Sequence, residues 1–122
     1  MNQTLDVRLP REPGAAAQAR RLVERYFGGQ LGDEALDDVR LVATELVDNA
    51  YVHGEGQITL RLTQREDRLR VEVIDQGQGA AIQIHHEEPS GQGHGLRMVD
   101  HICTAWGAYE GTTHVWAELL VR

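Results

Sequence analysis

The sequence predicts an α+β fold with two layers, because helical and strand-like segments are mixed without the regular alternation that builds a parallel sheet. Its length of 122 residues is typical of one domain, and no internal repeat or linker interrupts it. We therefore expect a single domain over residues 1–122, in which helices pack against a sheet.

The N-terminal segment predicts a strand followed by a helix. Three apolar residues of the strand alternate with polar ones: Leu5, Val7 and Leu9. Pro10 ends this strand, Pro13 suits the first turn of the helix, and Gly28 ends the helix. The apolar stripe of the helix is expected at four positions: Ala15, Ala19, Leu22 and Tyr26.

A second helix and a β-hairpin are predicted next. The helix has Asp33 as its N-cap, runs to about His53 and stops at Gly54. Two strands follow, each with one apolar face: Ile58, Leu60 and Leu62 in the first, Leu69, Val71 and Val73 in the second. The polar link Q-R-E-D-R joins them as a hairpin.

Periodicity disappears between Gln76 and Gln92, a stretch rich in glycine that predicts a long loop. Three residues at helical spacing then mark a third helix: Leu96, Val99 and Cys103. Residues 104–109 and 113–121 are expected to pair as a last hairpin across residues 110–112.

Charge and composition argue against several classes of protein. A net charge of −7 opposes general affinity for nucleic acid, which requires clustered basic side chains. All 12 basic residues are arginines, which excludes a P-loop lysine, a Schiff-base lysine and the strand lysine of protein kinases. The only serine, Ser90, lies in P-S-G and not in G-x-S-x-G, which argues against a serine hydrolase.

The cellular compartment is predicted from two further features. Cys103 is the only cysteine, so no internal disulfide can form and a reducing compartment is expected. The N-terminal residues M-N-Q-T-L-D-V-R-L-P contain no apolar targeting segment, and no apolar run approaches membrane-spanning length. We therefore expect a cytoplasmic protein with no direct contact to membrane or nucleic acid.

The second helix carries the first candidate site. Glu45, Asn49 and His53 follow one another at i, i+4 spacing, and aliphatic residues flank this line. A carboxylate and an amide in such surroundings are costly unless something hydrogen-bonds or coordinates them. They either bind a ligand or reach solvent or a neighbouring loop, and the helix alone does not decide between these alternatives.

The second candidate is Asp75, which follows the strand L-R-V-E-V-I and precedes Gly77 and Gly79. The spaced glycines allow backbone to approach a flat ligand closely, and the carboxylate can accept a hydrogen bond from an exocyclic amino group such as that of adenine. The alternative is a glycine turn that the aspartate side chain caps.

The third candidate is the segment G-Q-G-H-G-L, residues 91–96, which opens the third helix. Alternating glycines expose backbone N–H groups, and the helix N-terminus adds partial positive charge, so the segment suits a phosphate. Its spacing differs from the Rossmann G-x-G-x-x-G. The three candidates in this order are stronger evidence for a nucleotide-binding site than any one of them alone.

E-L-V-D-N-A, D-Q-G-Q-G and G-Q-G-H-G-L resemble the N, G1 and G2 boxes of the Bergerat-type GHKL ATPases. The resemblance implies a mostly antiparallel mixed sheet covered by helices on one face. The short segment Ala80–Ser90 and the closing T-H-V-W-A-E-L are similar to those of stand-alone anti-sigma-factor serine kinases. Sensor histidine kinases carry an additional phosphoacceptor helix pair, for which this chain has no room.

The resemblance assigns a role to each candidate residue. Glu45 would be the general base, Asn49 would bind both ATP and Mg²⁺, and Asp75 would receive the adenine amino group. The remaining contacts to ATP would come from residues of the glycine boxes and the last strand: Gly77, Gly79, Gly91, Gly93, His94, Gly95, Leu96 and Thr113.

The function implied is that of an ATP-binding anti-sigma factor with serine/threonine kinase activity. It would sequester a sigma factor and phosphorylate a STAS-type antagonist protein on serine, and the resemblance also implies a homodimer. The alternative is a regulatory module that binds partner proteins under the control of ATP without significant kinase activity. This alternative stays open because A-A-I-Q-I follows the G1 box where many relatives have a Phe-Asp-Pro-like sequence.

The histidines of the glycine-rich segment raise the question of a zinc site. His85 and His86 lie beside two glutamates, and His94 lies in the third candidate segment. No C-x-x-C or H-E-x-x-H motif accompanies them, so we interpret them as solvated polar residues.

Overall fold

The computed structural model describes residues 2–77, 94–109 and 114–121, with the backbone alone for residues 94–96. The described strands and helices are mixed without regular alternation, as the periodicity predicts. In chain order they are β1 (Asn2–Leu9), α1 (Ala15–Phe27), α2 (Asp33–His53), β2 (Ile58–Arg65), β3 (Arg68–Ile74), α3 (His94–Ile102), β4 (Ala105–Ala108) and β5 (His114–Leu120).

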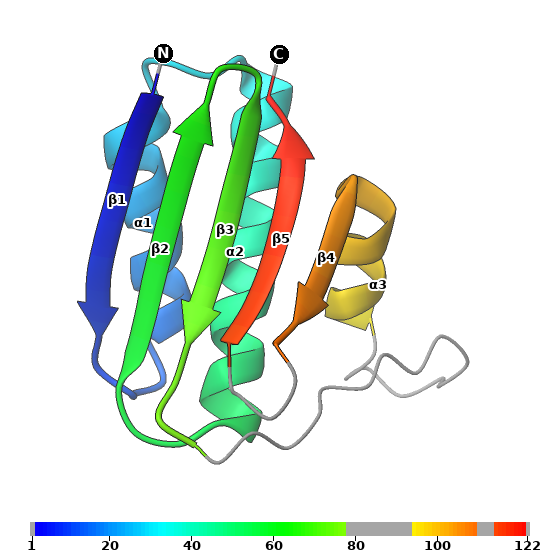
Figure 1. Ribbon diagram of the computed structural model, residues 1–122. Helices are drawn as coiled ribbons and strands as arrows, with labels where there is room; N and C mark the ends of the chain where they lie inside the picture. The colour runs from blue at the N-terminus through cyan, green and yellow to red at the C-terminus, as the bar shows by residue number, and fades with distance from the viewer. Residues whose placement is uncertain (1, 78–93, 110–113, 122) are drawn as a thin grey trace.

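The strands form one five-stranded sheet in the order β1-β2-β3-β5-β4 (Figure 1). Each neighbouring pair of described strands is antiparallel, so the sheet has no parallel pair among them. The β2–β3 and β4–β5 hairpins occur where the sequence predicts them. The last strand, β5, lies between β3 and β4, with Ile74 opposite His114 and Ala108 opposite Val115.

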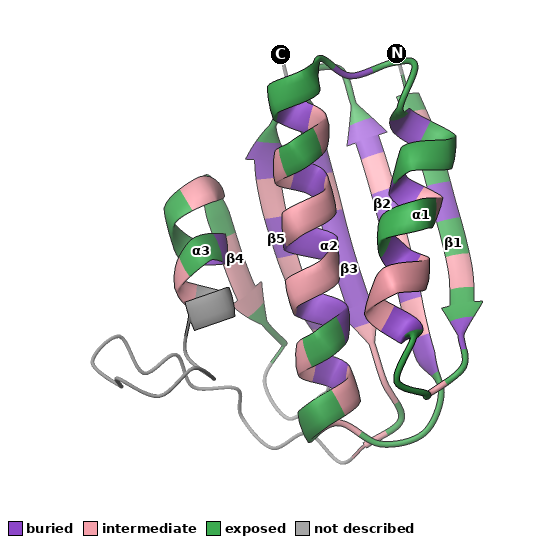
Figure 2. Cartoon of the chain, turned by 180° about the vertical axis from the view of Figure 1, so that it is seen from behind, coloured by how far each residue is buried: buried purple, intermediate pink, exposed green. Residues whose placement is uncertain are grey.

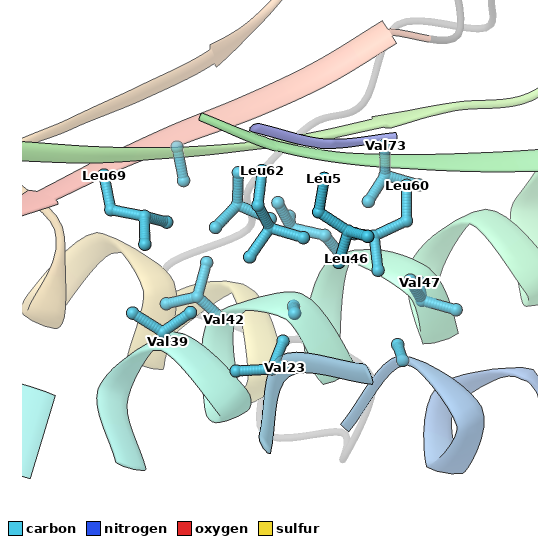
Figure 3. Packing of buried hydrophobic residues seen from close by; sticks show 14 of the residues in the cluster. Leu5, Val23, Val39, Val42, Leu46, Val47, Leu60, Leu62, Leu69 and Val73 are labelled. Atoms are coloured by element: carbon cyan, nitrogen blue, oxygen red, sulfur yellow. The ribbon is translucent and has the colours of Figure 1, made fainter. Parts of the chain in front are cut away.

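The helices lie on one face of the sheet, so the fold is the predicted α+β two-layer sandwich (Figure 2). Every second residue of the strands points toward the helices, because successive side chains of a strand alternate between its faces. Leu60 and Leu62 of β2 meet Val42 and Leu46 of α2 in the core between the layers (Figure 3). This packing fixes α2 against the sheet along its length.

The opposite face of the sheet carries cross-strand charged pairs. Arg61 donates to Asp6 over 2.9 Å, and this hydrogen bond raises the pKa of the arginine. His114 Nε2 lies 2.6 Å from the Glu72 carboxylate, which is only 9% exposed. Such a buried acid is tolerated because it has polar partners. No helix of the described part of the chain lies over this face.

The two long helices differ from the predictions in detail. Both α1 and α2 have glycine at their N-cap position, and α2 begins at Asp33 after Gly32, so Asp33 is not the cap. Pro13 precedes α1 and is not in its first turn. The stripe that α1 buries is Ala15, Ala19, Val23 and Phe27, whereas Leu22 is half-buried and Tyr26 is 42% exposed. Packing against α2 selects this stripe over the neighbouring one.

None of the helices in the described ranges is both long enough and apolar enough to cross a bilayer.

Candidate functional site

The elements that carry the described candidate residues have ends that meet at one end of the sandwich (Figure 1). The C-terminal ends of α2 and β3 lie there, together with the N-terminal ends of α3 and β5. The first candidate segment is described in full, with Glu45 and Asn49 on α2. The second is described as far as Gly77, with Asp75 directly after β3. Gly79, Gly91, Gly93 and Thr113 lie outside the described residues, as do His85 and His86.

Glu45 and Asn49 are both half-buried on α2, one helical turn apart. Their apolar neighbours Leu46 and Val47 point into the core, and this fixes the side of the helix on which the two polar groups lie. Burial, and secondly the nearby Asp48, raises the pKa of Glu45 above its ordinary value of 4.5. A carboxylate with a raised pKa is a better base near neutral pH than an ordinary one.

Asp75 is half-buried at the end of β3 and makes two contacts with backbone N–H groups. Its Oδ1 accepts from Gly77 over 2.7 Å and from Glu55 over 3.3 Å. The bond from Gly77 is the side-chain cap that a D-x-G turn favours. An ionised carboxylate has about four acceptor positions. The capping role is therefore compatible with a further hydrogen bond to a ligand.

The turn that follows α2 lies directly against Asp75. A Cβ atom built on Gly54 would overlap the Asp75 carboxylate, so only glycine leaves room for this packing. Gln76 donates its N–H to the Glu55 carbonyl over 2.8 Å, and Gln57 donates its N–H to the Gln76 side-chain oxygen over 2.9 Å. The end of α2 and the end of β3 therefore form one hydrogen-bonded unit.

Arg11 is a further member of this unit that the sequence interpretation missed. From the β1–α1 connection, its guanidinium donates to the carbonyls of Ala50 over 3.1 Å and Tyr51 over 2.5 Å, and also to the Gly54 carbonyl. Its guanidinium carbon lies 5.8 Å from the centre of the Tyr51 ring. The partners lie 39 to 43 residues away in the chain, so no local pattern could have revealed them.

α3 begins at His94 and so includes Gly95 and Leu96 in its first turn. This agrees with the prediction that the segment G-Q-G-H-G-L opens a helix. The first N–H groups of a helix have no intrahelical partner, and the partial positive charge at this end suits an anion. In the sheet, β5 pairs with β3, and its first residue His114 lies opposite Ile74, the residue before Asp75. The start of β5 is thus beside the end of β3.

The chemistry of these side chains fits a magnesium nucleotide. The Asn49 amide and the Glu45 carboxylate offer hard oxygen atoms, the donors that Mg²⁺ prefers. The Asp75 carboxylate accepts from two backbone N–H groups, and a carboxylate is the acceptor that an exocyclic amino group requires. A helix N-terminus faces the same end of the sandwich. These residues would hold the metal through Asn49, and a nucleotide base through Asp75.

The chain is similar to one family of domains and to a solved structure. Residues 9–117 match the model of the histidine kinase-like ATPase domain. No curated protein matches the chain. Among solved structures, the RsbU and RsbW domains of Rv1364c from Mycobacterium tuberculosis match it with 20% identity and a TM-score of 0.71. The match covers 98% of this chain and 32% of the Rv1364c chain, so this chain spans about a third of the length of the solved structure.

At that identity the structural likeness establishes the fold, which agrees with the predicted two-layer sandwich. The family model covers most of the chain and includes both helix α2 and strand β3. It confirms the resemblance to GHKL ATPases that the three glycine and acidic motifs indicate. The chain belongs to the family of histidine kinase-like ATPase domains.

Proposed function

We propose that the protein is an ATP-binding anti-sigma factor that acts as a serine/threonine kinase through a single domain over residues 1–122. Family membership supports the binding of ATP. The observation that carries the proposal is the junction between α2 and β3. It brings the helix of Glu45 and Asn49 against the carboxylate of Asp75, with Gly54 at the point of contact.

Each described residue has a defined task in this proposal. Asp75 accepts a hydrogen bond from the adenine amino group, and Asn49 contributes an amide oxygen to the metal. Mg²⁺, when bound, neutralises charge on the phosphates. Glu45 accepts the proton of a serine hydroxyl while the serine oxygen forms a bond to the γ-phosphorus and the bond to the departing ADP oxygen breaks. The raised pKa of Glu45 supports this role.

The remaining ATP contacts of the proposal come from the glycine boxes and the start of β5. Gly95 and Leu96 lie in the first turn of α3, where backbone N–H groups are available to phosphate. The proposed partners are a sigma factor and a STAS-type antagonist that carries the acceptor serine, and homodimerisation is part of the same proposal. All three partner assignments rest on the motif resemblance.

A phosphorylation assay tests the proposed activity. The protein is incubated with radiolabelled ATP, Mg²⁺ and candidate antagonist proteins, and the label is followed on the antagonist. Acid-stable label is expected, because phosphoserine survives acid and phosphohistidine does not. Glu45→Gln should reduce the rate by about 10²- to 10⁴-fold, the contribution of a general base. Glu34→Gln, an exposed acid of the same helix, should leave it unchanged.

The alternative function is an ATP-controlled binding module without phosphoryl transfer. The sequence A-A-I-Q-I after the G1 box favours it, because this stretch departs from the pattern of many relatives. A protein that binds a sigma factor in the presence of ATP and labels no antagonist would support this alternative over the kinase.

Nucleotide selectivity tests the binding site separately from the activity. Guanine presents an oxygen acceptor where adenine presents its amino donor, so the Asp75 carboxylate should reject it. Loss of a charge-assisted hydrogen bond costs about 1.5–3 kcal/mol. ATP should therefore bind at least about tenfold more tightly than GTP. Asp75→Ala should remove most of this preference, as measured by calorimetry. Equal affinities in the parent protein would contradict the role of Asp75.

A further inference from the structure

We infer that Arg11 is a positioning residue of the nucleotide site, which holds the end of α2 and, through the turn after it, the carboxylate of Asp75. The inference rests on the proposed function, since it concerns the selectivity of the same site. Arg11 lies outside the three motifs and belongs to the connection between β1 and α1.

The three acceptors of Arg11 are backbone carbonyls at the C-terminal end of α2. The last carbonyls of a helix lack the N–H partners that carbonyls of its interior have, and this end carries partial negative charge. The Ala50 carbonyl also accepts from the Gly54 N–H over 2.8 Å, so Arg11 is its second donor. Arg11 is half-buried and donates to Ala50, Tyr51 and Gly54. A planar guanidinium with five donors can serve several carbonyls at once, which a lysine ammonium does with less defined geometry. The position of the last helical turn therefore depends on this side chain.

The carbonyl acceptors lie next to the functional residues. Ala50 directly follows Asn49, the proposed metal ligand. Gly54 packs against the Asp75 carboxylate so closely that an added Cβ atom would overlap it. Glu55, the next residue, donates its N–H to Asp75 Oδ1 over 3.3 Å and accepts from the N–H of Gln76 over 2.8 Å. A shift of the helix end is thus transmitted to Asp75 through two consecutive residues.

This chain of contacts distinguishes positioning from simple stabilisation. A helix cap that only stabilises the fold would change the free energy of unfolding and leave the folded site as it is. Arg11 instead joins the β1–α1 connection to the helix end that packs against Asp75. Removal of the Arg11 side chain should therefore reduce the preference of the folded protein for ATP over GTP.

The experiment measures ATP and GTP affinities by calorimetry for the parent, Arg11→Ala and Arg11→Lys, well below each variant's Tm. Arg21→Ala, which removes an exposed arginine of α1, is the matched control. Arg11→Ala should weaken binding of ATP with Mg²⁺ by about 10- to 100-fold, the loss typical when a residue that orients metal ligands is removed. Its ATP-to-GTP preference should fall toward that of Asp75→Ala, and Arg11→Lys should recover part of it.

A double variant tests the route through Asp75. In the Asp75→Ala background, Arg11→Ala should cause no further loss of base preference, because coupled residues are not additive. Amide hydrogen exchange without nucleotide gives an independent readout. In Arg11→Ala, exchange at Glu55, Gln76 and Gly77 should accelerate while the core strands stay protected.

The outcomes separate the two proposals. If the parent prefers ATP and Arg11→Ala keeps that preference while losing only stability, the inference about Arg11 is wrong and the proposed ATP site stands. If the parent binds neither nucleotide, both are wrong.

Discussion

Gly54 and Asp75 are packed so that the backbone of the first fills the space beside the carboxylate of the second. Gly54 has an extended conformation, with φ −90° and ψ −168°, which any residue can adopt. The requirement for glycine is therefore one of space and not of backbone freedom. The missing side chain lets a helix end and a strand end meet at the proposed base-recognition residue.

Gly54→Ala should consequently displace Asp75. The new methyl group would overlap the carboxylate and lie 2.7 Å from the Ala50 carbonyl oxygen, so one of the two segments must move. We expect a lower Tm and a smaller ATP-to-GTP preference than in the parent. Gly29→Ala is the control, because a Cβ atom there meets nothing within 4 Å. Unchanged selectivity in Gly54→Ala would contradict the prediction that Gly54 keeps Asp75 in place.

Asn49→Ala should weaken binding of ATP with Mg²⁺ more than binding of ATP alone. In the proposed site the amide oxygen binds the metal, so its loss should cost about tenfold in affinity with Mg²⁺, or about 1.4 kcal/mol. Titrations with Mg²⁺ and with EDTA measure the difference. Asp48→Ala, which changes an exposed neighbour on α2, should show no such difference. An equal loss under both conditions would make Asn49 a structural residue.

Glu45→Gln should stabilise the protein at pH 7 in the absence of nucleotide. Folding raises the pKa of Glu45 above 4.5, so the unfolded chain releases this proton at a lower pH than the folded protein does. The ionised carboxylate therefore opposes folding at neutral pH, and this cost disappears as the pH falls below about 4.5.

Thermal unfolding across this range measures the effect. The Tm of Glu45→Gln should exceed that of the parent at pH 7 by a small amount, since the half-exposed group is partly screened by solvent. The difference should shrink below pH 4.5, the ordinary value for this group. Glu12→Gln, at an exposed position, is the control. A difference that does not change with pH would contradict the environment described for Glu45.

Cys103 should react slowly with thiol reagents. Burial, and secondly the nearby Asp38 and Asp100, raises the pKa of its thiol from 9.0 to about 12. The reactive thiolate is then about 1,000-fold scarcer at pH 8 than for an ordinary cysteine. Alkylation by iodoacetamide should be correspondingly slow in the native protein and fast in urea. Similar rates in both would show that Cys103 is exposed in solution.

The parts of the fold that depend on local pattern were predictable from the sequence. Alternation of Leu60 and Leu62 with polar residues predicts the buried face of β2, which the structure confirms. The end of α2 at His53 follows from Gly54 in the same way. These features are determined within a few neighbouring residues.

Features that depend on distant contacts were not predictable. In α1, the stripes through Leu22 and Tyr26 and through Val23 and Phe27 fit the helical period almost equally, and only packing against α2 decides between them. Arg11 gives no signal in sequence, because an arginine after a proline is unremarkable until the end of α2 lies beside it. The candidate site was therefore found by its motifs, while the residue proposed to position it was not.

The place of β5 between β3 and β4 also has a consequence for how the chain is made. As the protein emerges from the ribosome, β1 to β3 and the two long helices can already assemble around a common core. β4 and α3 emerge next, but β4 has no strand to pair with in the described sheet until β5 follows. Completion of the sheet, and with it the placement of the start of α3 at the same end of the sandwich as the end of β3, must wait for the last strand.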